Sequence, residues 1–439
     1  MTKSTNLKNY YTQQICTPSR ASFMTGKYPI HLGMQHYVIV NTQPSGLPLG
    51  EKIFPQYLKD CGYETFLIGK WHLGFFKTDY TPNKRGFDHF YGFLGAREDH
   101  YTKEECQKSK FDDRDYCGIS FHHNLTPDNS TFGQRSSKVY ADYLIDKLNQ
   151  KSSQNRFFLY STHDPHEPNQ VERKFLDLYE GIKEPRKSHL AMMSEFDNDF
   201  GRILDKVDMD NTIIIVSSDN GGETEYGGNN FPLRGQKWNF LQGGVRNIGF
   251  VYPDNFLGEV DEKIFHISDW MPTILSKVCN ADVNNIDGVN QIRDIRNEIL
   301  LNIDPLKKEP QFYSRFEEEL SNKTHFDVRY EAAYLKDSYK LITGKIDKPE
   351  RVSPPENEIL ISSTIADEEN ENLLHLFDIK NDPFELNNLA YEAKYQDLLQ
   401  DMLTKMSEFN ATSLPCHFPD HSPNAVPING FWQPWDDDQ

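Results

Sequence analysis

Three apolar segments that each follow an amphipathic helix constrain the fold of this 439-residue chain most strongly. Such alternation of a helix with a short, β-branched apolar run predicts parallel strands covered on both faces, and hence a doubly wound α/β sheet. Ligands bind at the carboxyl ends of these strands, so we expect the chemistry just after each one. The helix and strand ranges are 53–59 with 65–68, 141–149 with 156–161, and 196–207 with 212–218.

The C-terminal part of the chain has a different character. A charged stretch at 307–319 leads into alternating polar and apolar segments at 334–343 and 373–379, which is typical of antiparallel strands. Because the chain also exceeds the usual size of one core, we predict an α/β domain at 1–305 and a smaller α+β domain at 306–439 that ends in a Pro-rich tail.

The formal net charge of −19 argues against partners that are themselves strongly negative. Long-range repulsion would oppose nucleic acid and anionic membrane surfaces, and no run approaches the roughly 20 apolar residues of a membrane span. We therefore expect no nucleic acid and no membrane among the partners. Protonation of all 15 histidines would bring the formal charge to −4, so we expect the negative charge to relax in an acidic compartment.

Sequons and cysteines bear on the cellular compartment. True N-glycosylation would place the chain on the secretory route, whereas accidental spacing would produce the same pattern in an Asn-rich chain. Cys106 and Cys117 flank a polar segment at 107–116, so we predict a disulfide between them and an unpaired Cys16. We expect a lysosomal or secreted protein. The sequons begin at Asn124, Asn129, Asn322 and Asn410.

Four short segments carry the residues that could do chemistry. Each has an ordinary reading on its own: a cysteine in a Pro turn, a solvated lysine with a surface histidine, two structural histidines, or a tight turn. Residues alternate in side at a strand end, so Lys70 and His72 could reach one anion. Asp219 and Asn220 offer hard oxygen donors, which suit Ca²⁺ rather than Zn²⁺. The segments are Cys16-Thr17-Pro18-Ser19-Arg20, Gly69-Lys70-Trp71-His72-Leu73-Gly74, His163-Asp164-Pro165-His166-Glu167-Pro168 and Ser218-Asp219-Asn220-Gly221-Gly222.

Taken in order, and continued by the segments at 229–238 and 266–273, these motifs resemble the type I sulfatase family, most of all its arylsulfatase B branch. The resemblance implies an alkaline-phosphatase-like fold with a large mixed, mostly parallel sheet between helices and a smaller C-terminal domain on an antiparallel sheet. It implies hydrolysis of sulfate esters, of aryl sulfates or of N-acetylgalactosamine 4-sulfate in glycosaminoglycans. It also implies a calcium ion and a formylglycine made from Cys16 by a formylglycine-generating enzyme.

The resemblance also implies roles for individual residues. The hydrated formylglycine attacks sulfur, His72 orients or deprotonates it, and His166 or Lys237 protonates the leaving alcohol. His163 is a rival for the role of His166. The implied catalytic residues are Cys16, Arg20, Lys70, His72, His166 and Lys237, and the implied calcium ligands are Asp219, Asn220 and the modified Cys16.

The sequence departs from the family before the signature. Members of the family begin with a strand that ends in an Asp-Asp pair and supplies two more calcium ligands, whereas only fifteen residues precede Cys16 here. We therefore expect that strand and pair to be absent and calcium to bind weakly. One alternative is a catalytically impaired protein of this fold that binds sulfated glycans. Another is a phosphoesterase of the same superfold, but those enzymes use Ser or Thr with zinc and lack the pentapeptide.

Overall fold

The chain forms two compact units with separate sheets. The computed structural model describes residues 3–108, 110, 112–258, 263–308, 314–347 and 372–437; positions 309–313 of the charged stretch lie outside these ranges. Unit 1 contains Met1–Tyr37, Ile213–Thr224 and Gly228–His417. Unit 2 contains Val38–Thr212, Glu225–Gly227 and Phe418–Gln439.

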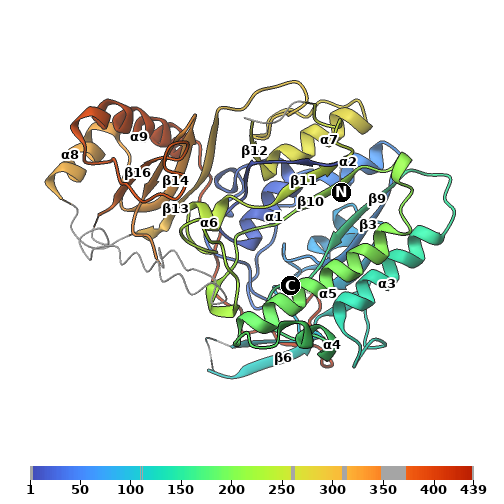
Figure 1. Cartoon of the computed structure of the whole chain (residues 1–439). Helices are drawn as coiled ribbons and strands as arrows, with labels where there is room; N and C mark the ends of the chain where they lie inside the picture. The colour runs from blue at the N-terminus through green and yellow to red at the C-terminus, as the bar shows by residue number, and fades with distance from the viewer. Residues whose placement is uncertain are drawn as a thin grey trace. The chain divides into compact units, whose positions relative to one another are not determined.

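The main sheet of unit 2 has five strands in the order β8-β7-β4-β3-β9 (Figure 1). β3 (Glu64–Lys70) pairs in parallel with both β4 (His89–Phe93) and β9 (Arg156–Ser161). β7 (Phe121–His123) and β8 (Thr126–Pro127) extend the sheet with antiparallel pairing. The first two strands expected from the sequence are therefore confirmed as parallel neighbours.

Helices of unit 2 precede the strands as the sequence pattern predicts. α2 (Phe54–Asp60) leads into β3, and α3 (Ser136–Asn149) leads into β9. α3 packs against β3, β4 and α5 (Arg186–Leu204), and Figure 1 shows α3 and α5 side by side. The buried residues of α3, including Val139 and Leu144, join those of the sheet in one apolar core. A short helix, α4 (Arg173–Leu176), precedes α5.

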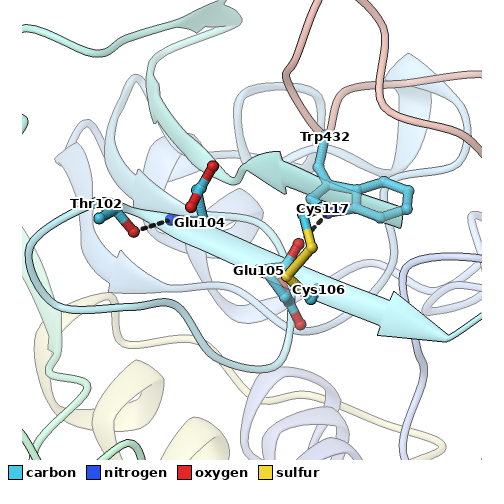
Figure 2. The surroundings of a disulfide bond; sticks show 6 residues. All are labelled: Thr102, Glu104, Glu105, Cys106, Cys117 and Trp432. Carbon is cyan, nitrogen blue, oxygen red and sulfur yellow. Dashed lines mark hydrogen bonds between the residues drawn. A yellow bond between two sulfur atoms is a disulfide. The ribbon is translucent and has the colours of Figure 1, made fainter. Parts of the chain in front are cut away.

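A disulfide-bonded hairpin completes unit 2. β5 (Glu104–Lys108) and β6 (Asp115–Ile119) are antiparallel, with Cys106 directly opposite Cys117. The predicted disulfide between these cysteines is confirmed (Figure 2). The buried Trp432 indole N–H donates to the Glu105 carbonyl at 2.8 Å, so the C-terminal tail lies against this hairpin.

A three-stranded antiparallel sheet in unit 1 follows the order β1-β11-β10. β10 (Ile214–Ser217) pairs with β11 (Gly249–Tyr252), which pairs with β1 (Thr5–Asn6). The sequence predicted that β10 would be a parallel strand. This prediction is wrong for its pairing with β11, which is antiparallel. An apolar run predicts burial, but the direction of the neighbouring strand depends on how the chain returns to it. β2 (Asn9–Tyr11) and β12 (Ile264–His266) form a separate parallel pair.

Two helices of unit 1 support its candidate functional residues. α1 (Cys16–Thr25) begins after an extended Ile15 and ends at Gly26, whose φ of 68° is the left-handed conformation that glycine favours at helix ends. α1 packs against α7 (Trp270–Val278). A single turn, α6 (Gln242–Val245), precedes β11.

The C-terminal part of unit 1 is an antiparallel sheet in the order β13-β14-β15-β16, as the sequence predicts. α8 and α9 lie together beside the sheet (Figure 1), and α9 buries Leu399, Met402, Leu403 and Met406 along one face. β13 runs across residue 305, and the domain boundary at that point remains a prediction. The elements are β13 (Glu298–Lys308), α8 (Arg315–Thr324), β14 (Tyr330–Lys336), β15 (Tyr339–Thr343), β16 (Leu374–Asp378) and α9 (Gln396–Ala411).

Candidate active site

Cys16 is the first residue of α1, where the backbone N–H groups of a helix favour a negative charge. Its side chain is a free thiol, as predicted, and the residue is only 3% exposed. The Gln13 N–H donates to the Ser19 hydroxyl at 3.2 Å, which ties the approach of the chain to the first turn. A group at position 16 is therefore held in a fixed place beside a helix N-terminus.

Arg20 connects α1 to the end of β10. It lies one helical turn after Cys16, on the same face of the helix. Its Nε donates to Asp219 Oδ2 at 3.0 Å, and both side chains are largely buried. Asp219 lies two residues after the end of β10, as expected for a residue at the carboxyl end of a strand.

The Asn220 side chain presents an oxygen that lacks a partner. Its Nδ2 donates to the Gly221 carbonyl at 3.0 Å, whereas its buried Oδ1 accepts no hydrogen bond from the described residues. A buried acceptor without a donor is a site for water or a cation. Gly221 makes this turn possible, because a Cβ there would lie 1.9 Å from the Gly243 carbonyl oxygen.

The turn at Asp219 and Asn220 offers the type of ligand that calcium prefers, but fewer ligands than calcium needs. Asp219 and Asn220 are hard oxygen donors of the type that Ca²⁺ prefers, and Ca²⁺ takes six to eight of them. Across the described ranges, no group of three or more His, Cys, Asp or Glu side chains could hold a metal ion. The two residues could therefore contribute part of a calcium site.

Lys237 is, with Arg20, the second positively charged side chain near Cys16 and Asp219. Its Nζ lies 3.0 Å from Glu223 Oε2, and Glu223 Oε1 accepts from the Trp238 indole at 2.9 Å. Burial lowers the pKa of Lys237, but the electrostatic influence of the neighbouring Cys16 and Glu223 outweighs burial, so its pKa is raised. Lys237 therefore stays charged near position 16. The sequence did not single out Glu223, whose only signal is an acid beside the Gly-Gly turn.

In unit 2, Lys70 is the last residue of β3, and His72 lies two residues after it. Both residues are 3% exposed. His72 has a φ of 59°, so it has left the strand and strand alternation does not describe its side chain. Its Nε2 donates to the Ile39 carbonyl at 2.9 Å, which leaves Nδ1 as the basic nitrogen of the neutral ring. That Lys70 and His72 reach one anion remains a prediction.

Glycine and tryptophan fix the backbone of this segment. Gly69 has a φ of 101°, and a Cβ there would lie 2.1 Å from the Ser161 carbonyl oxygen. The buried Trp71 indole donates to the Gly74 carbonyl at 2.9 Å. The backbone around Lys70 is therefore closely packed, which explains why glycines flank it.

Two histidines after β9, His163 and His166, stack in a row with His100. The ring centroid of His163 lies 4.4 Å from that of His100 and 5.7 Å from that of His166. His163 is 2% exposed; burial, followed by the charges of its histidine neighbours and Lys70, holds its pKa well below the usual range. Lys70 therefore lies in the electrostatic neighbourhood of His163. The sequence did not identify His100, which comes from a distant part of the chain.

His166 is the more accessible of the two rival histidines, because 22% of its side chain is exposed. Its Nδ1 donates to the Glu167 carbonyl at 2.9 Å, so its Nε2 is the basic nitrogen of the neutral ring. Glu167 is held by Arg97 at 2.6 Å. His166 can therefore take up or give a proton at Nε2, whereas His163 is kept neutral.

The fold is shared with solved structures. The crystal structure of Ps i-CgsB in complex with k-i-k-neocarrahexaose aligns with 96% of this chain and 88% of its own, with a TM-score of 0.73 and 21% sequence identity. The chain therefore has the alkaline-phosphatase-like fold.

Sequence comparisons define the family. The Sulfatase family model matches residues 1–278. The chain is 34% identical to mouse arylsulfatase J, over 98% of this chain and 74% of that protein. It is 27% identical to human N-acetylgalactosamine-6-sulfatase, over 64% of this chain and 57% of that protein. The chain belongs to the sulfatase family of enzymes, and its particular likeness to arylsulfatase B remains a prediction.

Proposed function

We propose that this protein hydrolyses the sulfate ester of a sulfated carbohydrate, with N-acetylgalactosamine 4-sulfate in glycosaminoglycans as the natural substrate and aryl sulfates as small substrates. The observation that carries the proposal is the cluster of Cys16, Arg20, Asp219 and Lys237 in unit 1. A sulfate ester resists nucleophiles because its oxygens are negative, so catalysis needs cations beside the nucleophile. Arg20 and Lys237 supply two of them.

The surroundings of Cys16 fit its conversion to formylglycine. Formylglycine at this position would supply, as its hydrate, the oxygen nucleophile for attack on sulfur. The side chain here is a free thiol at a helix N-terminus, and Lys237 lies in its electrostatic neighbourhood. Arg20 would orient the group from one turn away. A formylglycine-generating enzyme is accordingly a proposed partner.

A calcium ion would supply positive charge that neutralises the sulfate oxygens. Asp219 and the unpartnered Oδ1 of Asn220 would hold it, together with an oxygen at position 16. Arg20 would keep the Asp219 carboxylate in place, because its Nε binds one oxygen of that group. Further oxygens would have to complete the ligand set.

The family resemblance assigns proton transfer to His166, His72 and Lys237. His166, with its basic Nε2 and partial exposure, suits protonation of the leaving alcohol. His72, with its Nε2 bound to the Ile39 carbonyl, would accept a proton at Nδ1. Lys70, which is buried at the end of β3, would bind a sulfate oxygen.

A lysosomal or secreted location is part of the proposal. Asn129 and Asn322 are exposed and could carry glycans, and the Cys106–Cys117 disulfide suits an oxidising compartment. In the ranges that the structure describes, no helix is long and apolar enough to cross a membrane.

Activity and mass spectrometry test the proposal together. The protein is expressed in eukaryotic cells, its Cys16 peptide is analysed by mass, and turnover is measured on an aryl sulfate and on the 4- and 6-sulfates of N-acetylgalactosamine. We expect formylglycine at position 16, preference for the 4-sulfate, and loss of turnover by at least about 10³-fold in Cys16→Ala. Undiminished turnover in Cys16→Ala would sink the mechanism. Glycan binding without turnover in the wild type would instead favour the impaired binding protein.

A further inference from the structure

A pocket of about 400 Å³ in unit 1 adjoins the candidate active site. It shares Lys237 and Glu223 with the cluster around Cys16, and it extends from there to the C-terminal sheet. A volume of this size fits one or two sugar rings. The lining residues that matter here are Tyr37, Trp238, Lys307, Glu331, Lys345 and Asp347.

One wall of the pocket is aromatic. Tyr37 and Trp238 stack with their ring centroids 5.0 Å apart, and Tyr37 is 40% exposed. The Trp238 ring is fixed by its indole bond to Glu223 and by a backbone N–H that donates to the Gln14 carbonyl at 2.9 Å. A fixed, partly accessible aromatic face is a surface against which the apolar face of a sugar ring can pack.

Charged groups on and beside the C-terminal sheet also line the pocket. Lys307 of β13 lies 2.8 Å from Glu331 of β14, and Lys345, in the segment after β15, is exposed. Asn239 donates to the Asp347 carbonyl at 2.9 Å, which ties this segment to the loop that carries Trp238. This hydrogen bond connects the segment of Lys345 to the loop that carries the aromatic wall, within unit 1.

We propose that this pocket binds the sugar next to the one that carries the scissile sulfate, packs it against Tyr37 and Trp238, and binds an anionic group of that sugar through Lys307 and Lys345. The proposal rests on the proposed function, since Lys237 would contact the scissile sulfate. It narrows the substrate class to oligosaccharides with a second sulfate or a carboxylate. An aryl sulfate has no such group and would leave the subsite empty.

The pocket should bind an anion more tightly in acid. Glu331 competes with the ligand for Lys307, and burial raises the pKa of Glu331 to about 7 although Lys307 opposes this. The other charged groups around Glu331 are Asp304 of β13 and Asp347, which raise its pKa further, and Lys345. Protonation of Glu331 frees Lys307 and removes one negative charge from the pocket, so affinity should rise as the pH falls through about 7.

The experiment compares two substrates in matched variants. We would measure kcat/KM for an oligosaccharide with two anionic groups and for an aryl sulfate in the wild type, Lys345→Ala, Lys307→Met and Glu331→Gln. The control is Lys380→Ala, an exposed lysine of unit 1 that does not line the pocket. We expect each lysine variant to lower the ratio of the two kcat/KM values about tenfold, the cost of one charged hydrogen bond. Glu331→Gln should raise that ratio at pH 7.5, and Lys380→Ala should not change it.

A binding measurement separates failure of the subsite from failure of the proposed function. In the Cys16→Ala protein, calorimetry with a sulfated disaccharide that carries one or two anionic groups reports affinity without turnover. Weaker binding of the doubly anionic disaccharide after Lys345→Ala supports the subsite even if the wild type cleaves no sulfate ester. An unchanged ratio of kcat/KM in both lysine variants, or equal losses on both substrates, would overturn the proposal.

Discussion

Replacement of Glu331 by Gln is expected to change how the stability of the protein depends on pH. The Glu331 side chain is only 14% exposed, although Lys307 lies 2.8 Å away. Burial raises its pKa from 4.5 to about 7 in the folded state. The folded protein therefore binds this proton more tightly than the unfolded chain does, and stability falls as the pH rises between about 4.5 and 7. This difference between the folded-state and unfolded-state pKa of Glu331 corresponds to roughly 3 kcal/mol of unfolding free energy.

Urea unfolding, followed by tryptophan fluorescence at pH 4.5 and pH 8, measures this effect. The difference in unfolding free energy between Glu331→Gln and the wild type should become more favourable to the variant by about 3 kcal/mol from the lower to the higher pH. The control is Glu319→Gln, because Glu319 lies in an exposed ion pair with Arg315 and should give a nearly constant difference. A constant difference for Glu331→Gln as well would show that Glu331 ionises in the pocket at little cost, and would refute the reasoning.

Two further predictions concern the candidate active site. His166→Asn should lower kcat by about 10²-fold or more for a sugar sulfate and much less for an aryl sulfate with a good leaving group. His163→Asn should lower the melting temperature, and any loss of kcat should not depend on the leaving group. The opposite pattern would exchange the roles of the two histidines. Asn220→Ala should raise the calcium concentration for half-maximal activity by about tenfold or more and reduce the calcium-induced rise in melting temperature. The control is Asn211→Ala, because Asn211 is exposed. Equal calcium responses of both variants would exclude Asn220 as a calcium ligand.

Local sequence patterns predicted the elements that local physics determines. Apolar runs gave β3 and β9, and their parallel pairing followed from the helices between them. The Cys106–Cys117 disulfide was predictable because the hairpin that it closes is short. The pairing of β10 was not predictable, because its antiparallel neighbour β11 comes from a separate segment of the chain.

The expected response of the net charge to acid stays a prediction, and burial limits the part that histidines can play in it. Burial lowers the pKa of seven histidines, so they stay neutral where free histidines would be protonated. Because the folded state lowers these pKa values, the unfolded chain takes up protons at these histidines more readily, so they lower stability as the pH falls. These seven therefore contribute little to the relaxation of the charge, to which Glu105 and Glu331 contribute because burial raises their pKa values to about 7. The seven are His100, His122, His163, His189, His266, His375 and His421.

The motifs located the candidate site residues but not the contacts that hold them. Asp219 was recognisable after an apolar strand, whereas its bond to Arg20 depends on how α1 packs. Glu223 was not recognisable, because an acid in a glycine-rich turn looks like any other until it is seen beside Lys237. The orientation of the His72 side chain was not predictable either. It depends on a left-handed backbone conformation, which the alternation of residues along a strand does not predict.

The charges around Cys16 explain why metal and substrate should depend on each other. Arg20 is paired with Asp219 and Lys237 with Glu223, so these four side chains have no net charge. A sulfate ester that approaches them must compete with two carboxylates for the same cations, which weakens its binding. A divalent cation held by Asp219 and Asn220 would make the local charge positive and engage the carboxylate that now holds Arg20. Calcium and the sulfate ester should therefore each increase the affinity for the other, and Asn220→Ala should weaken substrate binding as well as calcium binding.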